Sequence, residues 1–251
     1  MNYTISLCIP FYNTSKYFLD CIKYSIDNTF INEIIVNDDF STEQEYSNLL
    51  QIVNQIKTNK IKVFRNTENV GAFRNKYITV QKSTSDWVYL LDSDNYPFKN
   101  TYNVLKSIEN LNPNICYSPS KLYCKNNDKV DYENISDYNT FKYDLIGIEE
   151  SKDAIIKRTK WFDWFINSGN YFFNRETYLE NLKEPFDNFS QYMLYADTAA
   201  AFYFWLKGGG QFKVIENLFH NHRLRPDSYW NTCGNNSQST VNLYSNMILE
   251  L

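Results

Sequence analysis

The chain has 251 residues, of which 43% are hydrophobic and 22% charged, so it is long enough to bury one sizeable core. A net charge of -4 and a pI near 5.3 exclude a global basic field for nucleic acid or an anionic membrane surface. No apolar run approaches the length of a membrane span, and no basic-plus-apolar leader precedes the first expected strand, so neither a transmembrane segment nor a secretory signal is expected.

The five cysteines are odd in number and lack paired C-x-x-C spacing, which favours a reduced, cytoplasmic compartment and argues against a zinc site. Cys8 lies in a strand pattern and Cys21 in a helix pattern, so both are expected to be buried thiols. The aromatic share of 18% is weak evidence of any function.

Strand and helix patterns alternate through the first 110 residues. The expected elements are a strand over 4–9 that Pro10 ends, a helix over 14–28 capped by Thr14 or Ser15, a strand over 33–37, a helix from Ser41 to about 57 whose Ser41 and Gln44 resemble a capping box, a strand over 61–64, a helix over 71–81 and a strand over 86–91. Short strands separated by helices predict parallel pairing with right-handed crossovers, and hence a doubly wound α/β unit.

The second half is less regular. Expected there are strands over 115–123, 171–173 and 212–215, a polar loop over 125–139, and helices over 151–159, 196–207 and 237–251, the second of them ended by Gly208 to Gly210. No linker or repeat interrupts the chain, so one domain over 1–251 is expected, with a nucleotide-binding half over 1–110 and an acceptor-binding half over 111–251.

Two strands of the first half end in pairs of acids: Asp38 with Asp39, and Asp92 with Asp94. Ligands of open α/β sheets bind beyond the carboxyl ends of the strands, so these acids are expected at the mouth of a site. Two carboxylates that repel each other are commonly held by a divalent cation with oxygen ligands. A polar turn built by Asp, Ser and Asn is the simpler alternative.

Four segments between Ile9 and Asp94 resemble, in order, the motifs of the inverting family 2 glycosyltransferases of the GT-A fold. They are Ile9-Pro10-Phe11-Tyr12-Asn13, Ile34 to Ser41 with Asn37 and Phe40 as departures, a compressed Asn66 to Asn75, and the D-x-D of Asp92-Ser93-Asp94. The resemblance implies a Rossmann-like three-layer α/β/α fold around a mainly parallel mixed sheet. It covers the first 110 residues well and the remainder in patches.

The resemblance also implies a donor site for a nucleotide sugar. Pro10 and Tyr12 would lie at this site, the Tyr12 ring against a uracil base, and Asp39 would accept the uracil N3 proton. Arg74 would lie near the diphosphate, although an exposed surface arginine is an equal alternative. Asp92 would contact the ribose or the water shell of the metal.

By the same resemblance, Asp94 would ligate Mn2+ or Mg2+ directly, and His222 would reach the metal or the diphosphate. His220 and His222 face one way if their segment is extended. Structural histidines, or phosphate clamping by Arg223 and Arg225, remain alternatives.

An inverting transfer also needs a base, and Asp197, at the expected start of a helix, matches the family position. A helix cap is the alternative role of Asp197, with Asp163 and Asp187 as other candidate bases. The aromatic residues Trp161, Phe162, Trp164 and Phe165 lie near the expected acceptor site and would either stack on a sugar or belong to the core.

The sequence therefore predicts a metal-dependent inverting glycosyltransferase that moves a sugar from a UDP-sugar to a hydroxyl of a glycan or glycoconjugate. A non-catalytic nucleotide-sugar or glycan-binding module is the alternative. A sugar-nucleotide pyrophosphorylase is disfavoured, because Pro10 to Asn13 stand where its glycine-rich phosphate loop would be.

Overall fold

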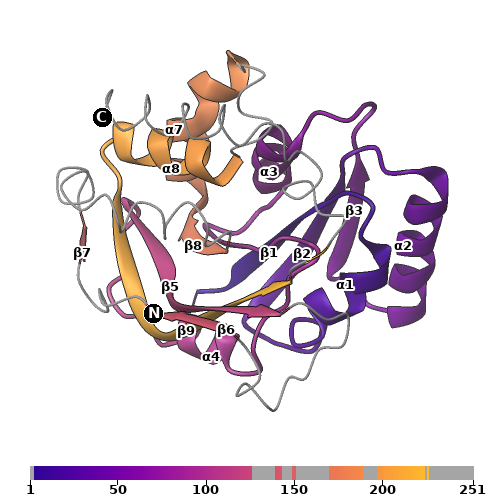
Figure 1. Ribbon diagram of the computed structural model, residues 1–251, viewed down its shortest axis with the longest axis horizontal. Coiled ribbons are helices and arrows are strands. Elements are labelled where there is room, and N and C mark those ends of the chain that lie inside the picture. Colours follow the sequence, from indigo (N-terminus) through magenta and orange to yellow (C-terminus); the bar gives the residue numbers. More distant parts are fainter. Residues whose placement is uncertain are drawn as a thin grey trace.

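The computed structural model describes residues 3–125, 139–142, 149–150, 170–188, 197–223 and 225 (Figure 1). Its strands are β1 (Ile5–Phe11), β2 (Ile31–Asp38), β3 (Ile61–Arg65), β4 (Trp87–Leu90), β5 (Ile115–Lys125), β6 (Asn139–Lys142), β7 (Glu149–Glu150), β8 (Tyr171–Asn174) and β9 (Gln211–Arg223). The helices of this part are α1 (Ser15–Ile22), α2 (Glu43–Ile56), α3 (Ala72–Gln81), α4 (Thr101–Lys106), α7 (Arg175–Asp187) and α8 (Asp197–Lys207).

The described strands form one mixed sheet in the order β3-β2-β1-β4-β8-β5-β9-β7, with β6 beside β5. β1 pairs in parallel with β2 and β4, and β2 pairs in parallel with β3. β8 is antiparallel to both β4 and β5. Because β1, β2, β3 and β4 run the same way, their carboxyl ends meet at one edge, as the sequence predicts for an α/β unit.

Side chains of the strands alternate between two cores, one on each face of the sheet. On β1, Leu7 and Ile9 pack with α1, α2 and α4, whereas Cys8 packs with α3, α7 and α8. The ribbon shows α7 and α8 beside α3, with α1 and α2 at the other side of the sheet (Figure 1). The predicted three-layer α/β/α arrangement is confirmed, and Cys8 and Cys21 are buried free thiols as predicted.

Several predicted boundaries are wrong by a few residues. Pro10 does not end β1, which continues to Phe11, and the pairing with β4 already stops at Cys8. Pro10 therefore has no β4 residue opposite it that would need its missing N–H. The cap of α2 is Thr42 rather than Ser41, since the Thr42 side chain accepts a hydrogen bond from the backbone N–H of Glu45.

Other elements are longer, shorter or unpredicted. α1 ends at Ile22, while β9 extends to Arg223. α4 and α7 were not predicted, and α7 gives a weak helical pattern because it buries only Tyr178, Leu182 and Pro185. Most of the predicted loop over 125–139, the helices predicted over 151–159 and 237–251, and the aromatic group at 161–165 lie outside the described residues.

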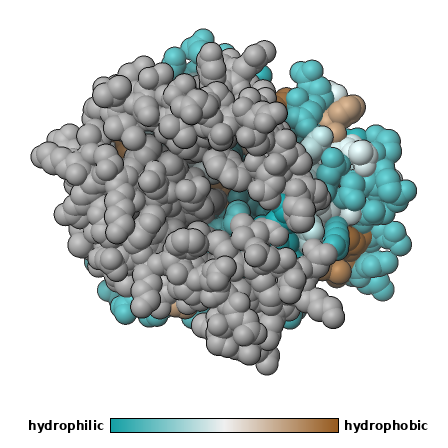
Figure 2. Space-filling model, viewed as in Figure 1, coloured by the Kyte–Doolittle hydropathy of each residue, from teal (hydrophilic) through white to brown (hydrophobic). Residues whose placement is uncertain are grey.

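The solvent-facing side of α2 is mainly hydrophilic (Figure 2). None of the described helices combines the length and the apolar character that crossing a bilayer requires.

A buried carboxylate, that of Glu33, connects three segments at the amino ends of the strands. It accepts hydrogen bonds from Ser6 Oγ at 2.7 Å, from Thr84 N at 2.6 Å and from Thr84 Oγ1 at 2.9 Å. Lys62 Nζ adds an ion pair at 2.7 Å. Burial alone would raise the pKa of Glu33, but these partners outweigh it and lower the pKa below its ordinary value.

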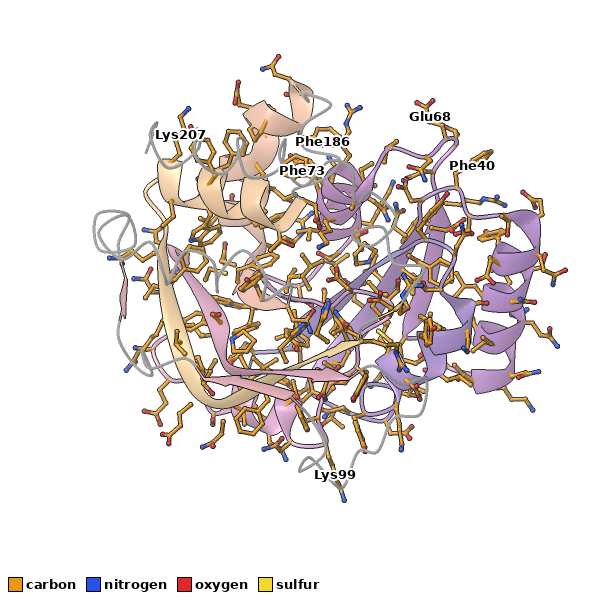
Figure 3. All side chains as sticks on the ribbon, in the orientation of Figure 1. Phe40, Glu68, Phe73, Lys99, Phe186 and Lys207 are labelled. Carbon is orange, nitrogen blue, oxygen red and sulfur yellow. The ribbon has the colours of Figure 1, made fainter. Side chains whose placement is uncertain are left out.

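We expect Glu33→Ala to destabilise the protein by about 3 kcal/mol at pH 7, because buried donors then lose a charged acceptor. A depressed pKa gives stability that is present above the unfolded-state pKa of about 4.3 and is lost as pH falls through the folded value. The difference in unfolding free energy between wild type and variant, measured in urea, should therefore shrink below about pH 4. Glu68→Ala is the control, since Glu68 is exposed (Figure 3). Equal losses in both variants would contradict this role of Glu33.

Candidate active site

Two loops beyond the carboxyl ends of β1 and β2 are hydrogen-bonded to each other. Asn13 N donates to Ser41 Oγ at 2.9 Å, and Thr42 N donates to Asn13 Oδ1 at 3.0 Å. Both Asn13 and Phe40 adopt left-handed backbone conformations, with φ of 51° and 59°. The rings of Tyr12 and Phe40 are 47% and 49% exposed, so both can contact a ligand (Figure 3 labels Phe40).

Asp39, at the end of β2, is buried and holds the turn that begins α3. Its Oδ1 accepts hydrogen bonds from Asn66 Nδ2 at 2.8 Å and Val70 N at 2.9 Å, and its Oδ2 accepts one from Gly71 N at 3.0 Å. Burial outweighs these bonds and raises the pKa of Asp39 above its ordinary value. A carboxylate offers about four acceptor positions, so Asp39 can still accept one more donor.

The neighbouring Asp38 has a local role. Its oxygens accept hydrogen bonds from Ser41 N at 3.2 and 3.3 Å, and Arg65 Nε lies 3.1 Å from Oδ2. Burial raises the pKa of Asp38 despite these partners. Asp38 therefore orients the 39–41 loop.

The D-x-D aspartates follow β4 directly and face different cations. Asp94 Oδ2 lies 2.9 Å from Arg225 Nε. Asp92 Oδ1 lies 3.0 Å from Lys76 Nζ. Between them, Ser93 Oγ accepts a hydrogen bond from Thr14 Oγ1 at 2.7 Å, which ties the segment to the start of α1.

Arg223 supports the same segment from β9. It donates from Nε to the backbone oxygen of Asp94 at 2.9 Å and pairs with Asp20 at 2.9 Å. Its backbone N–H donates to Asn95 Oδ1 at 3.0 Å. These contacts join β9 to the end of β4 and fix the backbone of the D-x-D segment.

Lys76, on α3, lies between Asp92 and the predicted base. Its side chain is 7% exposed and contacts Asp92 Oδ1, Asp197 Oδ2 and, at 3.5 Å, Thr198 Oγ1. Burial disfavours its charge, but the carboxylates of Asp197 and Asp92 prevail and raise the pKa of Lys76. Asp197 is the first residue of α8 and is partly exposed.

The groups around Asp92 shift its pKa in opposite directions. Burial raises the pKa of Asp92, Lys76 lowers it, and the carboxylates of Asp197 and Asp94 raise it again, so the net shift is upward. The structure thus brings together Asp92, Asp94 and Asp197, which the sequence predicts to act together.

Arg74 occupies a different place from the other predicted donor-site residues. Its guanidinium lies 4.9 Å from the centre of the Phe186 ring and donates to the Phe186 backbone oxygen at 3.5 Å. The Phe186 ring stacks on Tyr77 of α3, with ring centroids 4.3 Å apart. Arg74 therefore contacts α7, and its predicted proximity to a diphosphate stays a prediction.

The two histidines lie side by side on β9, with ring centroids 5.7 Å apart, as their spacing in an extended segment predicts. Neither ring nitrogen of the buried His220 has a hydrogen-bond partner in the described part of the chain. Burial, followed by the nearby His222 and Lys76, lowers the pKa of His220 well below its ordinary value. His220 is therefore a buried, neutral ring on β9.

The D-x-D oxygens are of the type that Mn2+ and Mg2+ prefer. Within the described ranges, no three His, Cys, Asp or Glu side chains converge as a complete metal-binding cluster. Such cations are often held by one or two carboxylates together with substrate phosphates and water. The donor set therefore fits a cation that completes its ligands with a diphosphate. Asp94 would hold it, with His222 as the second ligand that the sequence predicts.

Sequence reasoning gave no individual role to Lys76, Asn66 or Asn170, although Asn66 begins the third motif. Asn170 Oδ1 accepts a hydrogen bond from Asp92 N at 3.5 Å. Lys76 directly follows Arg74 and Asn75 of the third motif. A lysine on the buried face of a predicted helix was the available sign that it pairs with carboxylates. Of the other candidate bases, Asp187 is exposed at the end of α7, and Asp163 lies outside the described residues.

Comparison with known proteins places the chain in a family. The family model "Glycosyl transferase family 2" matches residues 6–183. The chain is 28% identical over 106 residues to the glycosyltransferase GlyG of Streptococcus pneumoniae serotype 4 (strain ATCC BAA-334 / TIGR4), covering 42% of this chain and 35% of GlyG. It thus spans about a third of that relative.

Two solved structures share the fold at low identity. GalNAc-T7 with UDP, GalNAc and Mn2+ has a TM-score of 0.64 and 17% identity, covering 98% of this chain and 47% of that one. The mannosyltransferase PcManGT from Pyrobaculum calidifontis, with GDP-Man and Mn2+, has a TM-score of 0.58 and 14% identity, covering 90% and 59%. The fold is that of the GT-A glycosyltransferases, and with the family match over 6–183 the chain belongs to glycosyl transferase family 2.

Proposed function

We propose that the chain catalyses an inverting, metal-dependent transfer of a sugar from a UDP-sugar to a hydroxyl of a glycan or glycoconjugate. The observation that carries this proposal is the convergence of Asp92 and Asp197 on one buried ammonium, with Asp94 two residues from Asp92. An acid that follows β4 thus lies near an acid at the start of α8, which supports a displacement between a bound donor and a bound acceptor.

On the donor side, exposed Tyr12 offers a ring for the base to lie against, and Asp39 has one acceptor position left for a base N–H. Asp94 and His222 would hold the divalent cation. A bound Mn2+ or Mg2+ neutralises the charge that builds on a departing nucleoside diphosphate. Both solved structures named above contain Mn2+, but one contains UDP and the other GDP-Man, so the uridine preference rests on Asp39.

On the acceptor side, Asp197 takes the proton of the attacking hydroxyl. The oxygen then bonds to the anomeric carbon as the bond to the diphosphate breaks on the opposite face, which inverts the configuration. Asp197 suits this role because α8 holds it at a helix start and Lys76 contacts only its Oδ2 among the contacts described. Oδ1 is then available for the acceptor.

Removal of the metal should weaken nucleotide binding. We expect Asp94→Ala to lower the affinity for UDP in the presence of Mn2+ by at least about tenfold, because one of few protein ligands is lost. EDTA should have the same effect on the wild type, measured by calorimetry. Asp86→Ala at the opposite end of β4, where the side chain is exposed, is the matched control. A UDP affinity that neither EDTA nor Asp94→Ala changes would rule out the metal role.

The choice of base should depend on Asp39. UDP should bind more tightly than GDP or ADP, and Asp39→Asn should reduce this preference by roughly tenfold or more, the equivalent of one hydrogen bond to a charged group. Asp38→Asn makes the same change in the adjacent acid that faces Ser41 and Arg65, and it should preserve the preference. Wild-type protein that prefers GDP would shift the donor to a guanosine sugar.

Loss of the base should abolish chemistry and spare binding. Asp197→Asn should reduce transfer by about 100- to 10,000-fold, since a general base typically contributes this much, while UDP affinity and melting temperature stay near wild type. Asp187→Asn, at the exposed end of α7, is the control. Transfer is measured as UDP release from a panel of UDP-sugars with and without acceptor. Unaltered turnover in Asp197→Asn would place the base elsewhere, and unfolding would make Asp197 a structural cap.

A further inference from the structure

We propose that Lys76 is the positioning residue of the transfer reaction: its ammonium orients the carboxylate of Asp197 toward the acceptor and ties it to Asp92 of the donor site. This inference rests on the proposed function, in which Asp197 is the base. Lys76 itself takes no proton from the substrate and acts only through Asp197.

The contacts of the Lys76 amine account for all its donors. An ammonium has three N–H groups, and the described acceptors are Asp92 Oδ1 at 3.0 Å, Asp197 Oδ2 and Thr198 Oγ1 at 3.5 Å. An amine held by three groups cannot rotate freely, so it fixes the direction of Oδ2 of Asp197. The contact described for Asp197 uses Oδ2, which leaves Oδ1 for the acceptor in the proposed reaction.

The three partners come from separate parts of the fold. Lys76 lies on α3, Asp92 follows β4, and Asp197 with Thr198 begins α8. α3 is in turn held to β2, because Asn75 Nδ2 donates to Asn37 O at 3.1 Å and Asn37 Nδ2 donates to Asn75 Oδ1 at 2.6 Å. The amine is thus carried by a helix that is fixed to the sheet, and it can serve as a rigid reference for α8.

A purely structural ion pair is the alternative. Buried ion pairs contribute little net stability, since the cost of removing charges from water offsets their attraction. A pair with only a structural role would act on the free energy of unfolding and leave transfer by the folded variant unchanged when it is removed. Removal of a residue that positions the base would instead change kcat and its pH dependence.

The test is Lys76→Met, which keeps the length of the side chain and removes the charge. Asp197 would then lose the cation beside its Oδ2, so it takes up a proton more readily and the acid limb of the kcat profile moves to higher pH by about one unit or more. On that limb kcat falls about tenfold per unit, whereas the KM for the UDP-sugar changes far less.

Three further variants complete the design. Lys76→Gln keeps hydrogen-bond donors without charge and should show the same shift. Lys76→Arg keeps the charge and should retain the wild-type position of the limb. Lys82→Met makes the same change at an exposed lysine just after α3 and should leave kcat and its pH profile unchanged.

The outcomes separate this proposal from the proposed function. Wild-type protein that neither binds UDP nor releases it from any UDP-sugar contradicts the proposed function itself. An active wild type, an inactive Asp197→Asn and folded Lys76→Met and Lys76→Gln variants with the wild-type kcat profile would overturn the role of Lys76 alone. Failure of both neutral variants to fold, shown by circular dichroism, would make Lys76 a structural residue and also overturn it.

Discussion

The buried ammonium group of Lys76 links the end of β4 to the start of α8. Lys76 cannot be buried as a cation unless carboxylates lie beside it, because the loss of hydration otherwise favours the neutral amine. Asp92 and Asp197 provide them, and the pKa of Lys76 is raised instead of lowered. The requirement is mutual, since each carboxylate also needs the cation, and it brings the start of α8 to the end of β4.

The topology of the sheet allows this contact between the start of α8 and the end of β4. Parallel pairing of β1 with β2 and β4 puts Tyr12, Asp39 and Asp92 at one edge, although they are far apart in the chain. The antiparallel β8 continues the sheet from β4, and α7 and α8 then cover the same face as α3. The start of α8 thereby lies beside α3 and the end of β4.

The two cationic side chains that pair with the D-x-D aspartates, Lys76 and Arg225, differ in their surroundings. Lys76 is enclosed between α3, β4 and α8, whereas Arg225 approaches Asp94 from beyond the end of β9. A divalent cation would compete with Arg225 for the carboxylate of Asp94, whereas a diphosphate would compete with Asp94 for the guanidinium of Arg225. The guanidinium in turn is suited to bind phosphate oxygens once it leaves Asp94.

Local sequence patterns predicted most of the strands and helices in the first 110 residues. Short, largely apolar runs identified β1 to β4, and the acids at strand ends marked the edge where the site is expected, because both patterns depend on residues close together in the chain. The same reasoning missed α7, whose buried residues are few, and misplaced the cap of α2 by one residue, because Ser41 and Thr42 are both capable caps and only the backbone geometry distinguishes them.

The sequence by itself determined the α/β class, the strand-end acids and the first residue of α8 as a candidate base, since each depends on residues close together in the chain. Only the tertiary structure decided that Lys76 pairs with Asp92 and Asp197, that Asp39 holds the turn before α3, and that Arg74 contacts Phe186. Lys76 and Asp197 are 121 residues apart (197 minus 76). A charge pair over that distance leaves no local pattern, because its partners are chosen by the packing of helices on the sheet.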